Sequence, residues 1–290
     1  MKKQITPEIL QLLKNKTGTS SLQLQPVGGG CINECFCITS TTKRFFLKIN
    51  SLSDYPGMFE TEKKGLEMLG IHQLIRVPAV VDCFENEDRQ FLILEWIETG
   101  ILTDGFWKKF GEQLASLHKV SNDFFGLADN NFIGSLRQLN TPSQSWADFF
   151  IECRIVPQLT LAKEKRLLPS SLSKNFEKLF TRLPEIFETS QPTLLHGDLW
   201  SGNFMCSENS DPVLIDPAVY FGHRSMDLAM TTLFGGFDDF FYEAYHYHFP
   251  FPANYKEQWD VCNLYPLLIH LNLFGSGYLS QIEAILKRFQ

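Results

Sequence analysis

The sequence lacks any long hydrophobic run. No apolar stretch approaches the roughly 18 residues that a membrane-spanning helix needs. The apolar core of a secretion signal is missing too, because Thr6-Pro7-Glu8 stands where that core should begin after Met1-Lys2-Lys3. We therefore expect neither a membrane span nor export.

Clustered positive charge is also missing. The chain has 26 Lys and Arg against 33 Asp and Glu, a formal net charge of -7, and no basic run longer than a pair. Nucleic acid and anionic membranes are recognised by clustered basic residues. Neither is an expected partner.

Cysteine shows no sign of a disulfide framework or a zinc site. The seven cysteines are an odd number, scattered through 290 residues that can form a large core without covalent links. Only Cys31, Cys35 and Cys37 cluster, and no second Cys/His pair completes a zinc ligand set. Alternation places Cys35 and Cys37 on one strand face, which favours core packing. The composition fits a cytoplasmic protein with reduced thiols.

The first third of the chain predicts a helix-flanked antiparallel sheet. Thr6-Pro7-Glu8 begins a helix that Gly18 ends, and a second helix is expected over residues 58–69. Strands are expected just before Gly28 and over residues 34–40, 44–50, 79–84 and 91–97. After a linker near residues 97–103, helical periodicity dominates at residues 107–118, 146–161, 172–187, 227–232 and 264–274. One β hairpin is expected to interrupt these helices, formed by NFM and VLID around the turn CSENSDP.

These patterns predict an α+β fold with two lobes. Residues 1–97 would form a small lobe with an antiparallel sheet, and residues 98–290 a larger, mostly helical lobe. Ligand sites favour the cleft between two such units.

Phosphoryl transfer needs backbone amides and a cation to hold the phosphates, a metal ion to bridge them and a base to orient the attacking hydroxyl. The sequence offers a candidate for each of these roles. Neither GxGxxG nor GxxxxGK[ST] occurs. However, Gly28, Gly29 and Gly30 would let backbone N–H groups approach an anion. A plain hairpin turn is the alternative interpretation of this triplet.

Lys48 lies in the apolar strand RFFLKIN, where an ammonium group needs a partner. Without one, the side chain would extend to solvent at a strand edge. Glu62 on the following helix is the predicted partner, because Leu66 and Leu69 share its helical spacing, whereas Glu60 faces another side. Kinases hold α- and β-phosphates with such a strand lysine and helix glutamate.

His196-Gly197-Asp198 followed by Asn203 has the H-x-D-x-x-x-x-N spacing of a kinase catalytic loop. Asp198 would accept the proton of a substrate hydroxyl, and His196 would support the loop. Asn203 and Asp216, at neighbouring ends of the predicted hairpin, would offer hard oxygen ligands to Mg²⁺ beside ATP. We also expect Asp227 to accept hydrogen bonds from backbone amides of this loop.

The stretches HGDLWSGN, IDPA, MDLAM, LFGGF and HLNLFGSGY resemble the fructosamine kinase (ketosamine-3-kinase) family, within the aminoglycoside-phosphotransferase-like kinases. The resemblance extends to GGGCINE, MFETE, NFIGSLRQLN and WADFFIECRIVPQL, and these stretches span nearly the whole chain. It implies a protein-kinase-like fold, ATP with Mg²⁺, and phosphorylation of the 3-hydroxyl of sugar-derived ketosamines, a deglycation activity. It also implies that Asp198 is the proton acceptor and that the backbone of Glu95, Trp96 and Ile97 receives adenine.

Two departures from the family pattern lie in the large lobe, where the sugar should bind. Ser225 precedes MDLAM where an acidic residue is common, and LYPLLIHLNLFG replaces the more usual LYHLLNHLNLFG. Trp200 offers a flat face to a sugar or to an amino-acid side chain. The choice between fructosamine and smaller ketosamines, and between a free glycated amino acid and a glycated protein side chain, stays open.

Two other functions compete with this interpretation. A kinase of another small hydroxyl compound, such as an aminoglycoside or choline, has the same Asp-x4-Asn motif and the same metal-binding aspartate. An inactive nucleotide-binding protein would lack Lys48, Asp198, Asn203 or Asp216, and none is missing.

One redox hypothesis concerns Cys31, which follows the glycine triplet. A loop that exposes N–H groups lowers the pKa of a nearby thiol, so oxidation of Cys31 would inhibit the enzyme reversibly. An inert small residue in a tight loop is the alternative.

Overall fold

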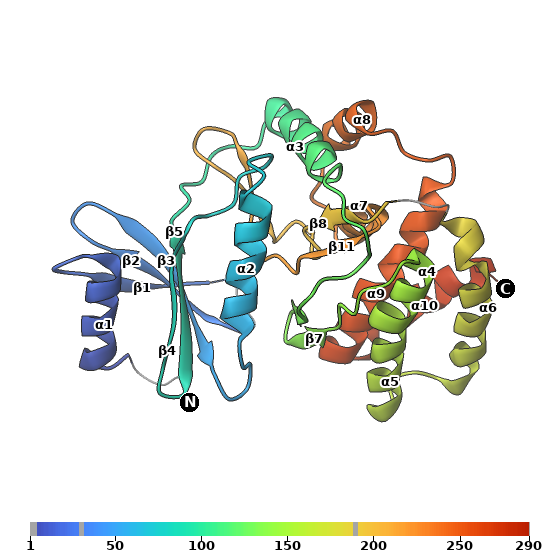
Figure 1. The fold of residues 1–290 in the computed structure, drawn as a ribbon, viewed down its shortest axis with the longest axis horizontal. Helices are drawn as coiled ribbons and strands as arrows, with labels where there is room; N and C mark the ends of the chain where they lie inside the picture. Colours follow the sequence, from blue (N-terminus) through green and yellow to red (C-terminus); the bar gives the residue numbers. More distant parts are fainter. Residues whose placement is uncertain (1–4, 29–31, 188–190, 290) are drawn as a thin grey trace.

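The computed structural model describes residues 5–28, 32–187 and 191–289. Gly29, Gly30 and Cys31, to which a phosphate contact and a redox role were assigned, lie outside the described residues. The chain forms two lobes side by side, a sheet with two helices and a larger set of helices (Figure 1). The predicted α+β architecture with two lobes is therefore confirmed.

The small lobe is built on one antiparallel sheet in the order β1-β2-β3-β5-β4. Its strands are β1 (Gln23–Val27), β2 (Glu34–Thr39), β3 (Arg44–Ser51), β4 (Val80–Asn86) and β5 (Arg89–Glu95). The helices α1 (Pro7–Thr17) and α2 (Met58–Gly70) cover opposite faces of this sheet (Figure 1). The Thr6 hydroxyl accepts a hydrogen bond from the Ile9 amide and so caps α1.

Strand alternation decides which side chains of β3 meet which helix. Leu47 and Ile49 pack with α1, in a cluster that includes Ile9 and Leu13. Lys48, between them, projects to the opposite face, where α2 lies. The sequence alternation of β3 thus directs its one buried cation toward the cleft side of the lobe.

The large lobe is mostly helical, as predicted. Its longer helices are α3 (Asp104–Leu117), α5 (Val156–Glu164), α6 (Ser170–Ile186), α7 (Ser225–Leu233), α8 (Asp239–His248), α9 (Tyr255–Phe274) and α10 (Leu279–Leu286). Two of these, α8 and α10, were not predicted. The helix expected over residues 146–161 is interrupted: α4 (Trp146–Phe149) and a wider π-helical turn, η1 (Phe150–Ile155), precede α5. Pro157 has no amide hydrogen to donate, which disfavours continuous α-helical bonding across this point.

Three short antiparallel strand pairs lie among these helices: β6 (Asn131–Ile133) with β7 (Leu136–Gln138), β8 (Thr193–Leu195) with β11 (Tyr220–Gly222), and β9 (Phe204–Cys206) with β10 (Pro212–Leu214). The third pair is the predicted hairpin. The prediction of a single β interruption was wrong, because the pairs β6–β7 and β8–β11 are also present. Short 3₁₀ turns, η2 (Ser276–Tyr278) and η3 (Lys287–Phe289), flank α10.

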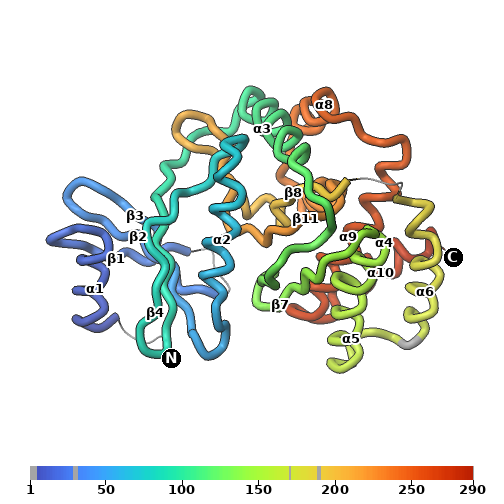
Figure 2. The backbone as a smooth tube through the Cα atoms, in the orientation of Figure 1, coloured from blue at the N-terminus to red at the C-terminus, as the bar shows by residue number. Residues whose placement is uncertain are grey.

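The connector between the lobes packs against the β9–β10 hairpin. The Gly100 amide donates to the Cys206 carbonyl at 2.9 Å, and the Glu208 amide to the Glu98 carbonyl at 2.8 Å. A Cβ atom on Gly100 would lie 2.1 Å from the Ser207 carbonyl oxygen, so only glycine fits there. Figure 2 shows this orange hairpin beside the connector and the upper end of α2. The hairpin that follows Asn203 is thereby fixed to both lobes.

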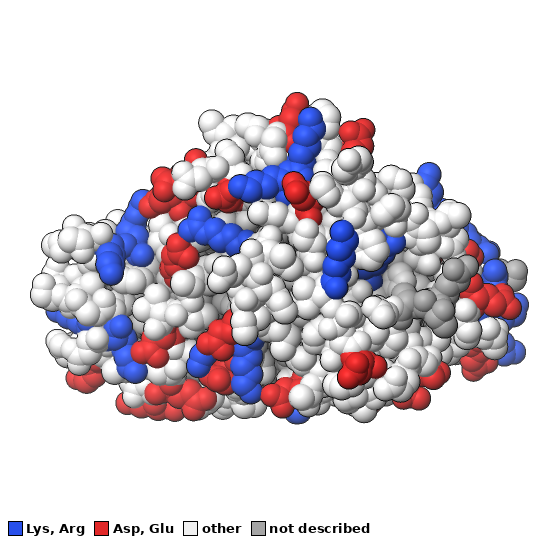
Figure 3. Space-filling model, turned by 45° about the horizontal axis from the view of Figure 1, so that its top comes forward, with Lys and Arg blue, Asp and Glu red and all other residues white. Residues whose placement is uncertain are grey.

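The surface carries charged side chains of both signs (Figure 3). On the face drawn in Figure 3, basic and acidic side chains are interspersed, with no large basic area. Among the described residues, no helix is long and apolar enough to cross a bilayer.

Candidate active site

A cleft of about 460 Å³ lies between the lobes. Its walls include the predicted site residues Lys48, Glu62, Asp198, Trp200, Asn203 and Asp216. These residues come from β3, from α2 and from the segments around β9 and β10. The fold therefore brings together side chains that are up to 168 positions apart in the sequence.

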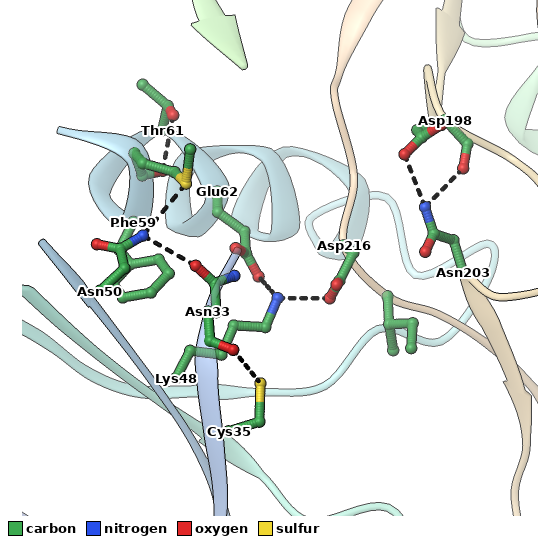
Figure 4. Close-up of polar contacts among 12 residues, drawn as sticks. Asn33, Cys35, Lys48, Asn50, Phe59, Thr61, Glu62, Asp198, Asn203 and Asp216 are labelled. Carbon is green, nitrogen blue, oxygen red and sulfur yellow. Dashed lines mark hydrogen bonds and ion pairs between the residues drawn. The ribbon is translucent and has the colours of Figure 1, made fainter. Parts of the chain in front are cut away.

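Lys48 connects the two lobes at the base of this cleft. Its Nζ lies 2.7 Å from Glu62 Oε1 and 2.6 Å from Asp216 Oδ1, and the side chain is 2% exposed (Figure 4). Burial alone would lower the pKa of Lys48, but Asp216 and Glu62 outweigh it and raise that pKa. The ammonium is therefore charged in the cleft.

The choice of Glu62 over Glu60 agrees with the structure. The Glu60 side chain is 50% exposed and faces Lys63 at 3.7 Å, one turn further along α2. Glu62 occupies the helix face that meets β3, as its spacing with Leu66 predicted.

Asp198 and Asn203 form a bonded pair on the large-lobe side. The Asn203 amide nitrogen donates to the Asp198 carbonyl and to Asp198 Oδ2, both at 2.9 Å (Figure 4). Burial raises the pKa of Asp198 to about 7, although the bond from Asn203 opposes this shift. A carboxylate with such a pKa has the proton affinity that general-base catalysis near neutral pH requires.

Asp216 lies next to this pair because of the hairpin. The Ile215 amide donates to the Asn203 carbonyl at 3.1 Å, directly after the β9–β10 register ends. Asp216 itself has a φ of 54°, a left-handed conformation that aspartate tolerates better than most residues. This turn directs its carboxylate toward Lys48.

Asp227 supports the backbone of the predicted catalytic loop. This carboxylate accepts the amides of His196 at 2.8 Å and of Gly197 at 2.9 Å, as predicted, and it is 1% exposed. His118 Nε2 lies 3.2 Å from Asp227 Oδ2, and His118 Nδ1 lies 2.8 Å from the Tyr245 hydroxyl. Burial would raise the pKa of Asp227, but the hydrogen bonds from His118 and Gly197 outweigh it and lower that pKa. Burial lowers the pKa of His118, so a neutral imidazole donates to an ionised Asp227.

Two more features fix the loop geometry. Gly197 has a φ of 85°, and a Cβ atom there would lie 2.1 Å from the Ala218 carbonyl oxygen. His196 is fully buried, with Nε2 at 2.9 Å from the Ile215 carbonyl and Nδ1 accepting the Asp198 amide. His196 therefore supports the loop, as predicted, and does not face the cleft.

Replacing Asp227 with asparagine is expected to destabilise the fold by about 3 kcal/mol. The NH₂ group of asparagine would face N–H donors that now bond to the carboxylate, and this network is buried. The urea midpoint of unfolding measures this destabilisation. Asp129→Asn is the matched control, since Asp129 forms an exposed pair with Lys64 and should shift stability by no more than ~0.5 kcal/mol. Equal midpoints for the two variants would contradict the supporting role of Asp227.

Of the other predicted site residues that the structure describes, one lines the cleft and four do not. Trp200 lines the cleft and is 37% exposed. Gly28 is described but does not line the cleft, and neither do Glu95, Trp96 or Ile97. The Glu95 carboxylate binds Arg76 at 2.6 Å and the Ala79 amide at 3.1 Å. The side chain of this expected hinge residue is thus engaged elsewhere, and its backbone amide donates to the Ala79 carbonyl at 2.8 Å.

Several cleft residues were not predicted. Phe132, Gly134 and Ser135, from the β6–β7 hairpin, and His270 and Phe274, from the end of α9, line the large-lobe half. They lie within stretches quoted for the family resemblance, but no spacing rule indicates that they reach the site. Asn33 lines the small-lobe half, just after the glycine triplet.

Comparisons with known proteins agree with this geometry. Residues 5–290 match the model of a family described as fructosamine kinase. A Synechocystis protein named "Probable ketoamine kinase" is 39% identical over 268 residues, which cover 90% of this chain and 88% of that protein. The Arabidopsis thaliana protein-ribulosamine 3-kinase is 37% identical over 283 residues, which cover 96% of this chain and 86% of that protein.

Solved structures show the same fold. A crystal structure from Thermobifida fusca that carries a fructosamine-3-kinase name has a TM-score of 0.88 and 28% identity, covering 98% of this chain and 99% of that one. An aminoglycoside phosphotransferase structure has a TM-score of 0.62 at 14% identity, covering 96% of this chain and 98% of that one. That second likeness concerns the fold alone.

Proposed function

This chain belongs to the fructosamine kinase family, and we propose that its cleft positions ATP and a ketosamine for phosphoryl transfer to the 3-hydroxyl of the sugar. The observation that carries the proposal is the juxtaposition of Lys48, paired with Glu62 and Asp216, with the Asp198–Asn203 pair across one cleft. Ketosamine kinase activity with ATP is what the family and its named relatives share.

Each of these residues has a separate role in the proposed reaction. Lys48 holds the α- and β-phosphates, and Glu62 keeps its ammonium in place. Asp198 accepts the proton of the 3-hydroxyl as that oxygen forms its bond to the terminal phosphorus, and the bond from phosphorus to the bridging oxygen breaks to release ADP. Asn203 orients Asp198 by donating to it.

The donor set fits Mg²⁺. Because the Asn203 nitrogen donates to Asp198, its amide oxygen is left for a cation, and Asp216 supplies a carboxylate beside it. Among the described residues there is no cluster of three or more His, Cys, Asp or Glu side chains that could hold a metal alone. Two hard oxygens suit an ion that takes its other ligands from phosphates and water. When bound, it would neutralise charge that develops on the transferred group.

Asp216→Ala is therefore expected to raise the Mg²⁺ concentration for half-maximal activity by ~10–100-fold or more, because loss of even indirect metal partners has effects of that size. The maximal rate should fall as well. The measurement is a Mg²⁺ titration of ATP turnover. Asp211→Ala is the control, since Asp211 lies on the same hairpin but bonds Lys109 at the surface. Superimposable titrations for the wild type and Asp216→Ala would remove Asp216 from the metal site.

The acceptor half of the cleft suits a sugar derivative better than a polycation. Among the described residues that line the cleft, the acidic side chains are those of Glu62, Asp198 and Asp216. The proposed mechanism assigns all three to phosphoryl transfer. Trp200, His270 and Phe274 give this half flat aromatic surfaces, against which a sugar face can stack. This composition favours a ketosamine, free or on a protein side chain, over an aminoglycoside.

The test is a panel of acceptors with ATP and Mg²⁺, with the position of the phosphate in the product read by NMR. Fructosamine, ribulosamine and erythrulosamine derivatives should be phosphorylated at the 3-hydroxyl, and Asp198→Asn should abolish this product. Transfer to choline or an aminoglycoside with no ketosamine turnover would replace the proposal with the related kinase function. Nucleotide binding without transfer to any acceptor would favour the inactive alternative.

We also propose a cytoplasmic setting, because the six cysteines that the structure describes are free thiols. The name of the Arabidopsis relative places that protein in the chloroplast, which is likewise an intracellular compartment.

A further inference from the structure

Two asparagines on the small-lobe side of the cleft form a pair that phosphoryl transfer, as described above, does not use. The Asn50 amide nitrogen donates to Asn33 Oδ1 at 2.9 Å and lies 3.3 Å from Met58 Sδ (Figure 4). Asn50 is 8% exposed, and its Oδ1 is buried without a hydrogen-bond partner among the described residues. A buried unsatisfied oxygen weakens a fold, so packing alone does not explain an amide at this position.

The strand register places this pair next to Lys48. Glu34 pairs with Ile49 and Cys35 with Lys48 across β2 and β3, so continuing this register by one residue sets Asn33 opposite Asn50. Lys48 and Asn50 are two residues apart and share one face of β3. Figure 4 shows Asn33 between Asn50 and the Lys48–Glu62 pair.

The same register gives the nucleotide a direction. Phe45 pairs with Glu95, where the proposed adenine-binding segment begins, so this proposal places the base end of the site at the start of β3. Lys48 is three residues further along, and Asn50 lies about 7 Å beyond Lys48 in the same direction. A nucleotide whose α- and β-phosphates contact Lys48 therefore extends its terminal phosphate toward Asn50 and Asn33.

Asn33 has a donor free for that phosphate. Its Oδ1 accepts from Asn50, whereas no described residue accepts a hydrogen bond from its Nδ2, and the residue lines the cleft together with Lys48. The bond from Asn50 fixes which end of the amide is free, because an oxygen already turned toward Asn50 leaves the NH₂ group to face the cleft. A neutral amide donor adds a hydrogen bond to phosphate without competing with the cation.

We propose that Asn33 binds the terminal phosphate of ATP through its side-chain amide, and that Asn50 is the positioning residue that orients it. The inference rests on the proposed ATP site. Asn33 and Asn50 would then let the site distinguish ATP from ADP. Lys48 cannot do so, because it contacts only the α- and β-phosphates, which both nucleotides have.

The first test compares nucleotide affinities by titration calorimetry, with Mg²⁺ and without acceptor. Asn33→Ala is expected to weaken ATP binding roughly tenfold, the effect of losing one hydrogen bond to a charged group, and to leave ADP binding within about twofold. Equal changes for ATP and ADP, or no change for either, would overturn the assignment. If the wild type bound no nucleotide, the proposed function itself would fail, whereas normal ATP binding by both proteins would remove only the role of Asn33.

The second test separates positioning from packing. Asn50→Leu removes the unsatisfied oxygen, so its melting temperature should be unchanged or higher, while its preference for ATP over ADP should fall as in Asn33→Ala. Asn263→Leu is the matched control, because Asn263 is also 8% exposed with a buried, unpartnered Oδ1, but it does not line the cleft. The double variant Asn33→Ala/Asn50→Leu should bind ATP no more weakly than Asn33→Ala alone. An Asn50→Leu protein with a lower melting temperature and an unchanged ATP preference would show that Asn50 only packs.

Discussion

Replacing Asp198 with asparagine is expected to lower turnover by about 10²–10⁴-fold, the usual contribution of a general base. Asparagine has nearly the shape of aspartate, and its side-chain oxygen can still accept the bond that Asn203 now donates to Asp198 Oδ2. It cannot accept the proton of a hydroxyl. ATP affinity should be nearly unchanged, because the substitution leaves Lys48 and Glu62, on the small-lobe wall of the cleft, in place.

Stability provides the control for this substitution. Burial raises the pKa of Asp198, so the ionised carboxylate is less favourable in the folded chain than in the unfolded chain. A group with a raised folded pKa destabilises the fold increasingly as pH rises above its unfolded pKa, and the neutral asparagine avoids this effect. Asp198→Asn should therefore melt at the same or a higher temperature at pH 8. Turnover within about threefold of the wild type would contradict the base assignment.

Residues close together in the sequence were predictable because local rules relate them. His196, Asp198 and Asn203 lie on one loop, and their spacing alone indicates a kinase catalytic loop. Glu62 was chosen over Glu60 because helical periodicity relates it to Leu66, and it is Glu62 that bonds Lys48.

The remaining parts of the site depend on contacts between distant segments. His118 and Tyr245, which complete the support of Asp227, are 127 positions apart, and nothing in the local pattern relates them. Asn33 and Asn50 face each other only through the register of β2 and β3, which a sequence does not state. The strands β6, β7, β8 and β11 have three residues each, and tertiary packing forms them without a recognisable pattern.

The second large effect is expected for Lys48→Met, which should reduce kcat/KM for ATP by about 10²–10³-fold, the size seen when one electrostatic contact to a reacting group is removed. Methionine keeps much of the side-chain volume but removes the charge between Glu62 and Asp216. Burial already raises the pKa of Glu62, and loss of the ammonium, which opposes this shift, should raise that pKa further. Asp216 would also lose the bond to Lys48 that orients its carboxylate. The KM for ATP should therefore rise and kcat should fall together, in contrast to the kcat effect of Asp198→Asn.

Glu62→Gln tests how much of this effect depends on orienting the lysine. Glutamine can accept from the Lys48 ammonium but carries no charge, so the same two parameters should change in the same direction by a smaller factor. Glu60→Gln is the matched control on the same helix, because Glu60 points to solvent beside Lys63 and should leave both parameters unchanged. A silent Glu62→Gln together with a defective Glu60→Gln would mean that the working enzyme pairs Lys48 with the other glutamate, and that α2 rotates when nucleotide binds. The ordered series Lys48→Met, Glu62→Gln, Glu60→Gln would instead mean that the ion pair seen at 2.7 Å already has the geometry that holds the phosphates.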